Sequence, residues 1–386
     1  MKREIQPEAR QDISIEVAVS EALAWMERAQ DNSSSADGGV ARHYSLLSGW
    51  SASYPETTGY IVPTLIAEGR SRGNDVLLNR ARKMLNWLVR IQMPSGAFQG
   101  STIDNSVVRP VTFNTGQILL GLAAGVKEFG PKYRNAMMAA ADWLVETQDP
   151  DGCWRRYPTP FAAPGEKSYE THVAWGLFEA ARLEDGRGYG EAGMRNVYWA
   201  LANQNAAGWF ANCCLTDPSN PLTHTIGYVL RGLVEAYRFS GDPKILQAAI
   251  RTAEGALGAL RPDGFLPGRL DRHWQSTATW SCLTGTEQIA TCWLLLYRHT
   301  RDQRFRDAAL AANRYVRETV NLHASPEARG AIKGSFPVSG EYERFQYPSW
   351  ACKFFIDANS LELKISQEEE IVSPIPLRFA AAAVPH

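Results

Sequence analysis

The sequence has almost no net charge and lacks any long run of apolar residues. Lysine and arginine total 40 against 41 aspartates and glutamates, which gives a formal net charge of −1. It therefore has no basic surplus of the kind that binds nucleic acid. No segment approaches the roughly 18 apolar residues of a membrane-spanning helix, and residues 1–8, MKREIQPE, lack the apolar core of a secretory signal. We expect a cytoplasmic protein with no membrane span and no nucleic-acid partner.

The six cysteines lack the spacing of a metal site or a disulfide framework. No Cys-x-x-Cys pair and no Cys/His metal spacing occurs in the chain. Cys213 and Cys214 are adjacent, which is a poor geometry for a bond between them. We predict reduced, mostly buried thiols, and we predict no metal ion or other cofactor.

One short phrase recurs through the chain. Residues 148–154, QDPDGCW, share a Gln-x-x-x-Gly-aromatic pattern with residues 92–98 and 204–209, and residues 261–265 hold a degenerate copy. The glycines of these four copies are each 56 residues apart, and a fainter first copy contains Gly38 and Gly39. A fixed period of this length indicates a repeat architecture.

Each repeat contains two helical patterns. The first is amphipathic with a charged face, at about residues 15–29, 74–91, 131–147, 189–203, 243–260 and 302–319. The second is apolar nearly all round and rich in small residues, at residues 57–68, 114–126, 170–182, 224–239, 284–299 and 349–360. A helix that is apolar on every side is a buried one. Its glycines lower helix propensity and indicate close approach to neighbouring helices.

Six charged-face helices that alternate with six buried ones predict an all-α fold, an (α/α)6 toroid. Its inner ring of parallel helices is wrapped by an outer antiparallel ring, so the inner helices all begin at one end of the barrel. We assign residues 15–362 to the toroid, residues 1–14 to an N-terminal extension and residues 363–386 to a tail without a predicted fold.

The predicted inner helices begin with similar polar phrases. Their threonines and serines suit N-caps. Capping does not explain the ionisable and amide groups beside them, which would be costly to bury without partners. Each of these groups taken alone has a structural explanation, but the set favours a shared, partly wet cavity at this mouth. The candidate catalytic residues are Glu56, Asn114, Glu170, His172, His224 and Glu287.

Aromatic, amide and charged groups gather at the same helix starts and in the loops that lead to them. Loops on a rigid scaffold often carry binding groups. Flat aromatics beside carboxylates and amides suit a sugar ring, and they also suit a polyprenyl chain or a carbocation. The candidate substrate-binding residues are Trp50, Tyr60, Arg109, Gln117, Tyr169, Trp280, Gln288 and Tyr347.

The Gln-x-x-x-Gly-aromatic repeats and the helix-pair period resemble the superfamily of squalene cyclases and protein-prenyltransferase β-subunits. The resemblance implies the toroid but not the reaction, since lyases, glycoside hydrolases and sugar epimerases share this fold. The Asp-x-Asp-Asp acid of those cyclases is absent here, and the Asp/Cys/His zinc set of the prenyltransferases has no clear match. Residues 54–60 and 334–350 are similar to toroid proteins associated with bacterial polysaccharide biosynthesis.

The leading hypothesis is an enzyme that acts on an acidic glycan or glycan intermediate, as a lyase, an epimerase or a hydrolase. In a lyase or epimerase, Asn114, Gln117 or Arg109 would neutralise the substrate carboxylate, and His172, His224 or Tyr169 would remove a proton. In a hydrolase, Glu170 and either Glu56 or Glu287 would be the acid and base. The alternatives are a terpene-cyclase-like enzyme that uses Glu56 or Glu170 as its acid, and a non-catalytic glycan-binding protein. The oligomeric state stays open.

Overall fold

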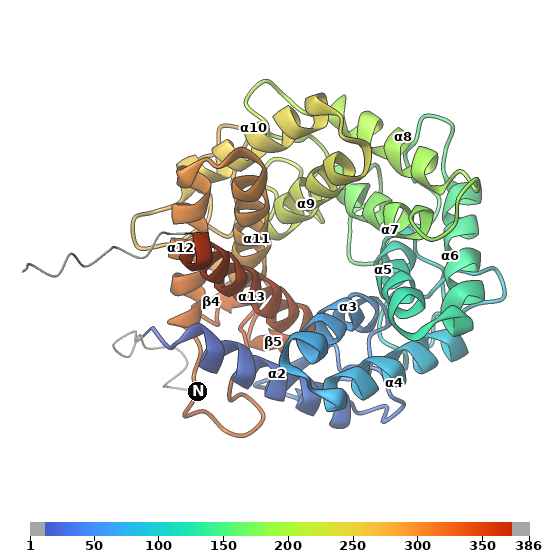
Figure 1. The fold of residues 1–386 in the computed structure, drawn as a ribbon, viewed down its shortest axis with the longest axis horizontal. Helices are drawn as coiled ribbons and strands as arrows, with labels where there is room; N and C mark the ends of the chain where they lie inside the picture. The colour runs from blue at the N-terminus through green and yellow to red at the C-terminus, as the bar shows by residue number, and fades with distance from the viewer. Residues whose placement is uncertain (1–11, 373–386) are drawn as a thin grey trace, which may run out of the picture.

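The chain forms two concentric rings of helices (Figure 1), which confirms the predicted (α/α)6 toroid. The computed structural model describes residues 12–372, with side chains through residue 369. Each inner helix contacts the next, and α13 contacts α3 to close the ring. The inner ring consists of α3 (Pro55–Arg72), α5 (Thr112–Phe129), α7 (Thr171–Ala181), α9 (Thr223–Ser240), α11 (Leu283–Thr300) and α13 (Ser349–Val372). The outer ring consists of α2 (Ile15–Asp31), α4 (Asp75–Ile91), α6 (Arg134–Thr147), α8 (Tyr189–Leu201), α10 (Pro243–Ala259) and α12 (Gln303–Arg317).

The loops contain short strands and 3-10 helices that were not predicted from the sequence. An antiparallel sheet has the strand order β2-β1-β5, and a second sheet pairs β3 with β4. These elements are β1 (His43–Ser45), β2 (Gly49–Trp50), β3 (Ser281–Cys282), β4 (Ser335–Phe336), β5 (Gln346–Pro348) and the 3-10 helices η1 (Pro131–Tyr133) and η2 (Ser168–Glu170). The pairing of β1 with β5 brings the first loop of the chain beside the last one.

The predicted C-terminal tail begins too early. Helix α13 continues to Val372, so residues 363–372 are helical. The helix is held beyond residue 362 by contacts with its neighbours: Arg298 pairs with Glu368 and Arg306 with Glu369. Residues 373–386 and 1–11 lie outside the described residues.

Small residues let the inner helices pack closely. A Cβ atom on Gly121 would lie 2.2 Å from the carbonyl oxygen of Gly59, and one on Gly176 would lie 2.5 Å from that of Gly116. No side chain fits at such distances, so these glycines set the spacing of α3, α5 and α7. All six cysteines are buried free thiols, as predicted.

The recurring phrase connects neighbouring outer helices through hydrogen bonds. In three repeats the glutamine amide nitrogen donates two hydrogen bonds, one to the carbonyl of the glycine in the same phrase and one to a carbonyl 44 residues later, on the next outer helix. For Gln148 the acceptors are the carbonyls of Gly152 and Ala192, at 3.0 and 2.9 Å. Gly152 has a φ of +97°, and a Cβ there would meet the Arg195 carbonyl at 2.5 Å. The phrase therefore locks each outer helix to the next one.

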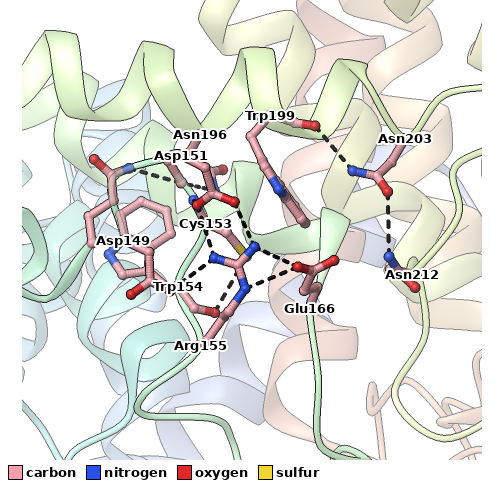
Figure 2. A network of polar contacts seen from close by, with 12 residues as sticks. Asp149, Asp151, Cys153, Trp154, Arg155, Glu166, Asn196, Trp199, Asn203 and Asn212 are labelled. Carbon is pink, nitrogen blue, oxygen red and sulfur yellow. Dashed lines mark hydrogen bonds and ion pairs between the residues drawn. The ribbon is translucent and has the colours of Figure 1, made fainter.

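The first and sixth copies of this turn complete the ring. In the first copy the glycine with positive φ is Gly38, at +106°, rather than Gly39, and Gln30 donates to its carbonyl. The sixth copy, which the sequence did not reveal, is Gly330: its φ is +74° and it packs on Glu21 of α2. In the third copy, Arg155 adds ion pairs with Asp149, Asp151 and Glu166 (Figure 2).

The prediction that threonines cap the inner helices is wrong. The residue before α3 is Tyr54 and the one before α5 is Val111, and neither makes a side-chain cap. Instead, Thr58 donates back to the Tyr54 carbonyl and accepts from the Val40 amide. Thr115 makes the equivalent bonds to the Val111 carbonyl and the Phe98 amide. These threonines tie the incoming loop to the helix that follows it.

Candidate active site

A cavity of about 250 Å³ lies where the inner helices begin. The second residue of four inner helices lines it: Glu56 of α3, Phe113 of α5, His224 of α9 and Trp350 of α13. The fourth residue after Glu56 and the fourth after His224, which are Tyr60 and Tyr228, lie one turn deeper in the same cavity. The other lining residues are Arg42, Tyr54, Thr159, Phe161, Tyr169, Leu215, Glu341, Tyr342 and Glu343.

Glu56 is a buried carboxyl group that titrates near neutral pH. Pro55 opens α3 and fixes its first turn, so Glu56 projects from the helix start, where its exposed fraction is 8%. Burial raises the pKa of Glu56 to about 7, although the Tyr54 hydroxyl and Arg42 oppose the rise. That hydroxyl donates to Glu56 Oε2 at 2.7 Å. A pKa near the ambient pH suits a group that both gives and accepts protons.

His224 lines the cavity and is held through one ring nitrogen. Its Nδ1 lies 2.8 Å from Oε1 of Gln288, which comes from the adjacent helix α11. Because an amide oxygen only accepts, Nδ1 carries the proton and Nε2 keeps its lone pair. Burial lowers the pKa of His224 to about 4, so the ring is neutral at physiological pH. Tyr228 and Tyr342 pack against the ring, at centroid distances of 4.4 and 5.1 Å.

His172 repeats this arrangement behind the cavity wall. Its Nδ1 lies 2.6 Å from Oε1 of Gln117, and its ring packs against Phe113 and Tyr228. The side chain is buried, does not line the cavity and has no hydrogen-bond partner at Nε2 within residues 12–369. Gln117 and Gln288 thus orient imidazole rings and do not themselves line the cavity.

An ion pair forms part of the cavity wall. Arg42 donates to both carboxylate oxygens of Glu343, at 3.0 and 2.7 Å. Its guanidinium also lies over the rings of Trp350 and Phe161, at 4.9 and 5.5 Å from their centroids. Glu343 has a φ of +48°, a backbone conformation that non-glycine residues rarely adopt and that often marks functional sites.

Two of the predicted carboxylates do not reach this cavity. Glu170, in η2, is buried near Lys167 and Arg155, and desolvation raises its pKa well above the ordinary value. Glu287 is buried on α11 toward Arg317 of α12 and Glu362 of α13, away from the cavity. The expectation that both face the shared mouth is therefore wrong, because each points from its helix start toward surrounding protein.

Asn114 lies one layer behind the cavity wall. Its side chain is fully buried and donates to the Tyr54 hydroxyl at 3.4 Å and to the Gln99 carbonyl at 3.3 Å. Through Tyr54 it is linked to Glu56 and does not line the cavity itself. The prediction that Asn114 lines the cavity is therefore wrong, and its side chain instead supports Tyr54 from behind the wall.

Four of the predicted binding residues lie elsewhere. Trp50 packs against Trp25 and Tyr44, and Arg109 is exposed on a loop. Trp280 packs on Gly268, while the ring of Tyr347 lies near the ring of Tyr44 and near the Lys333 ammonium group. None of the four lines the cavity; among the predicted binding residues, Tyr60 and Tyr169 do.

Several cavity residues were absent from the predicted site. The four-residue spacing from His224 to Tyr228 would have revealed Tyr228, because residues that far apart share a helix face. The position of Phe113 and Trp350 as second residues of their helices would have revealed those two. Nothing in the sequence indicates Arg42, which reaches the site because β1 pairs with β5, about 300 residues later in the chain.

Comparison with known proteins supports the fold. The sequence model for the squalene-hopene cyclase C-terminal domain matches residues 77–234, which is less than half of the chain. An unsaturated glucuronyl hydrolase specific for heparin has a similar structure, with a TM-score of 0.74 and 14% identity over 92% of this chain and 98% of that one. Cellobiose 2-epimerase from Bacillus thermoamylovorans aligns with a TM-score of 0.71 and 10% identity, over 90% and 98% of the two chains.

A sugar epimerase from a ruminal bacterium is also similar, with a TM-score of 0.72 and 11% identity over 90% of this chain and 97% of that chain. No curated protein sequence matches this chain significantly. At these identities the structural likeness establishes the shared toroid and leaves the reaction open.

The remaining expectations concern metals and membranes. Within residues 12–369, no group of three or more His, Cys, Asp or Glu side chains is placed to hold a metal ion. None of the helices in the described part of the chain is long and apolar enough to cross a bilayer.

Proposed function

We propose that the chain is a carbohydrate-active enzyme that moves a proton on one sugar unit, as an epimerase or a lyase. The observation that carries the proposal is the placement of Glu56 and His224. They come from α3 and α9, which are three steps apart in a ring of six and therefore face each other across the barrel axis (Figure 1). Both line the same small cavity.

The cavity suits a sugar ring. Its walls are largely tyrosine, phenylalanine and tryptophan side chains, which pack against the apolar face of a pyranose. Its volume of about 250 Å³ lies just below the usual range of ligand sites, so it accommodates one unit and not a long segment of polymer. The similar structures whose names describe glucuronyl hydrolases and sugar epimerases are consistent with a saccharide ligand.

The two ionisable groups complement each other chemically. Nε2 of His224 accepts a proton from a carbon atom beside a carbonyl or carboxyl group, and the enolate oxygen that forms needs a proton donor. Glu56, with a pKa of about 7, is present both as the acid and as the carboxylate at neutral pH. Its protonated form supplies that donor, and its ionised form is a stronger base than His224, whose pKa is about 4. Groups on opposite sides of one ring also allow a proton to leave from one face and return to the other, as epimerisation requires.

The lining favours proton abstraction over hydrolysis. A hydrolase needs two carboxyl groups that flank the bond to be cleaved. Here the partner of Glu56 across the axis is an imidazole, and Glu343 is bound to Arg42 through two hydrogen bonds. Glu341, the third carboxyl group of the lining, is 70% exposed and lies 3.4 Å from Arg269. If the carboxylate of an acidic sugar replaced Glu343, Arg42 would bind it through the same two donors. We therefore expect the substrate to be an acidic sugar.

Solvent exchange tests the proposal. The protein is incubated in D2O with glucuronate, galacturonate, cellobiose and N-acetylglucosamine, or with their oligosaccharides, and deuterium at the ring carbons is measured by NMR. We expect enzyme-dependent deuterium incorporation with at least one sugar, reduced by roughly 100-fold or more in Glu56→Gln and in His224→Asn. Ligand binding without exchange in the unmodified protein would instead favour the non-catalytic glycan-binding protein.

A terpene-cyclase-like activity is the second candidate, because the sequence matches the squalene-hopene cyclase domain and the cavity is aromatic. The chemistry of Glu56 argues against it: a carboxyl group whose pKa is raised to about 7 is a weak acid, whereas protonation of an alkene needs a strong one. Cyclised product from squalene or geranylgeranyl diphosphate, lost in Glu56→Gln, would overturn the ranking.

A further inference from the structure

A second, larger cavity of about 1100 Å³ lies at the opposite end of the barrel. Its walls come largely from the middle and later turns of the inner helices, including Leu120 of α5, Trp175 of α7 and Leu295 of α11. An aromatic layer separates it from the candidate active site: Tyr60 and Tyr228, which line the first cavity, both pack against Phe354, and Lys353 of the second cavity lies 4.3 Å from the Phe354 ring centroid. The reaction proposed above uses none of this second space.

Two cations near the aromatic layer have unused donors. Lys353 has a side-chain exposure of 3%, and its Nζ contacts Asp357 at 2.6 Å, its one ion-pair partner in the described part of the chain. An ammonium group has three donors, so the others remain available toward the cavity that Lys353 lines. Burying such a charge is costly unless its donors find partners.

Arg231 also has hydrogen-bond donors that are not used. Its Nε donates to Glu235 at 2.8 Å, and its guanidinium lies 4.2 Å from the ring centroid of Trp175. Its two terminal nitrogens have no hydrogen-bond partner among the side chains that the structure describes, and the residue lines the cavity. Both cations line the same cavity, and burial, with a smaller contribution from the charge of Arg231, lowers the pKa of Lys353.

The surrounding charges do not cancel this pair. Four carboxylates also line the cavity, those of Glu16, Glu68, Glu179 and Asp357, and the inner-helix C-termini add partial negative charge. Three of the four are paired: Glu68 with Arg72, Glu179 with Arg182, and Asp357 with Lys353. Lys127 and Lys364 line the cavity too and make no ion pair with other described residues. The lining therefore holds six cationic groups against four acidic ones.

We propose that this cavity binds an amphiphilic anion. Its oxyanion head, a phosphate or a carboxylate, accepts hydrogen bonds from Arg231 and Lys353, and its apolar body packs on the leucine, alanine and tryptophan side chains of the wall. Planar guanidinium and buried ammonium donors are the groups that recognise such heads. The site is independent of the proposed sugar chemistry at the other mouth, so either assignment can fail without the other.

Calorimetric titration of the full chain tests the site, with octyl phosphate, octanoate and the neutral 1-octanol as probes. The decisive variant is Arg231→Gln. Glu235 keeps two contacts of 3.0 Å with Arg238 in this variant, so no buried acid is left unpaired. Arg238→Gln is the matched control, because it removes the other cation from the same glutamate and Arg238 does not line the cavity.

We expect saturable binding of at least one anionic probe, weakened about tenfold or more in Arg231→Gln and within about twofold of the unmodified protein in Arg238→Gln. Lys353→Met should weaken binding similarly, and Glu56→Gln should leave it unchanged. The preferred head group follows from which anion binds more tightly. The proposal is overturned if neither anion binds saturably, if 1-octanol binds as tightly as the anions, if the two arginine variants lose affinity equally, or if Glu56→Gln abolishes binding.

Discussion

Glu56 and His224 occupy the same position, the second residue, of helices on opposite sides of the inner ring, and each is followed four residues later by a tyrosine that lines the same cavity. The two groups are supported differently. A tyrosine hydroxyl donates to the carboxylate, while a glutamine amide accepts from the imidazole. These supports set which group gives a proton and which accepts one, and they can be altered separately.

Removing the Tyr54 hydroxyl should raise the pKa of Glu56. That hydroxyl stabilises the carboxylate and lowers its pKa, against the larger effect of burial. In Tyr54→Phe the carboxylate loses its hydrogen bond, so its titration should move to a pH above 7 by about one unit. The measurement is the pH dependence of the sugar exchange rate, whose alkaline limb should move upward. A limb that stays in place would show that Glu56 is not the group responsible for it.

Replacing Glu56 should change how stability depends on pH. The pKa of Glu56 is about 7 in the folded chain against an ordinary value of 4.5. The folded state therefore binds the proton more tightly, and the contribution of Glu56 to stability is present below pH 4.5 and is lost as the pH rises to 7. Relative to Glu56→Gln, the unmodified chain should lose up to about 3 kcal/mol of unfolding free energy across this range.

Urea denaturation at several pH values measures that difference. The effect of His224, whose lowered pKa makes stability fall as the pH drops from 6.5 to about 4, is present in both proteins and cancels. A constant difference between the two proteins from pH 4.5 to 7 would contradict the raised pKa.

Gln288 should act through the orientation of His224. Gln288→Leu removes the acceptor that holds the Nδ1–H proton, so the ring loses its fixed tautomer and orientation. We expect the sugar exchange rate to fall by roughly tenfold or more while sugar affinity changes little. Gln117→Leu is the matched control, since it breaks the same kind of bond at His172, behind the cavity wall. Equal losses in both variants would indicate a general packing defect.

The glycine of the repeated phrase should be irreplaceable. In Gly152→Ala the new methyl group would lie 2.5 Å from the Arg195 carbonyl, at a φ of +97°. Gly73 also has a positive φ, +60°, but a Cβ there meets no atom within 4 Å. We expect Gly73→Ala to cost about 1 kcal/mol of unfolding free energy and Gly152→Ala to cost several times more. Similar losses of unfolding free energy in the two variants, measured by urea denaturation, would show that the close packing at Gly152 is dispensable.

The fold was predictable because its signal is repeated. Six helix pairs with two distinct patterns, separated by glycine turns at a fixed spacing, leave few arrangements other than closed rings. The helix starts were also predictable, but the direction in which a residue points from them was not. Glu56 and His224 are second residues of their helices, whereas Glu287 is the fifth residue of α11. Three residues at 100° each leave Glu287 only about 60° from the direction of the second residue, so the position along the helix does not predict that it lies toward Arg317 and Glu362 and not in the cavity.

Contacts between distant loops could not be predicted. Arg42 and Glu343 are brought together by the pairing of β1 with β5, and such short strands leave no clear pattern in the sequence. The length of α13 was underestimated for a similar reason, because its last turns are held by ion pairs with Arg298 and Arg306 from other parts of the ring.

The most direct test of the account is the titration of Glu56 itself. Carboxyl carbons of 13C-glutamate-labelled protein are followed by NMR from pH 4 to 9, with Glu56→Gln to assign the signal. We expect one carboxyl signal, missing in the variant, with a midpoint near 7 that changes when a sugar binds. A midpoint near 4.5 that no sugar alters would contradict the assignment of Glu56 as the proton-transfer group of a sugar site.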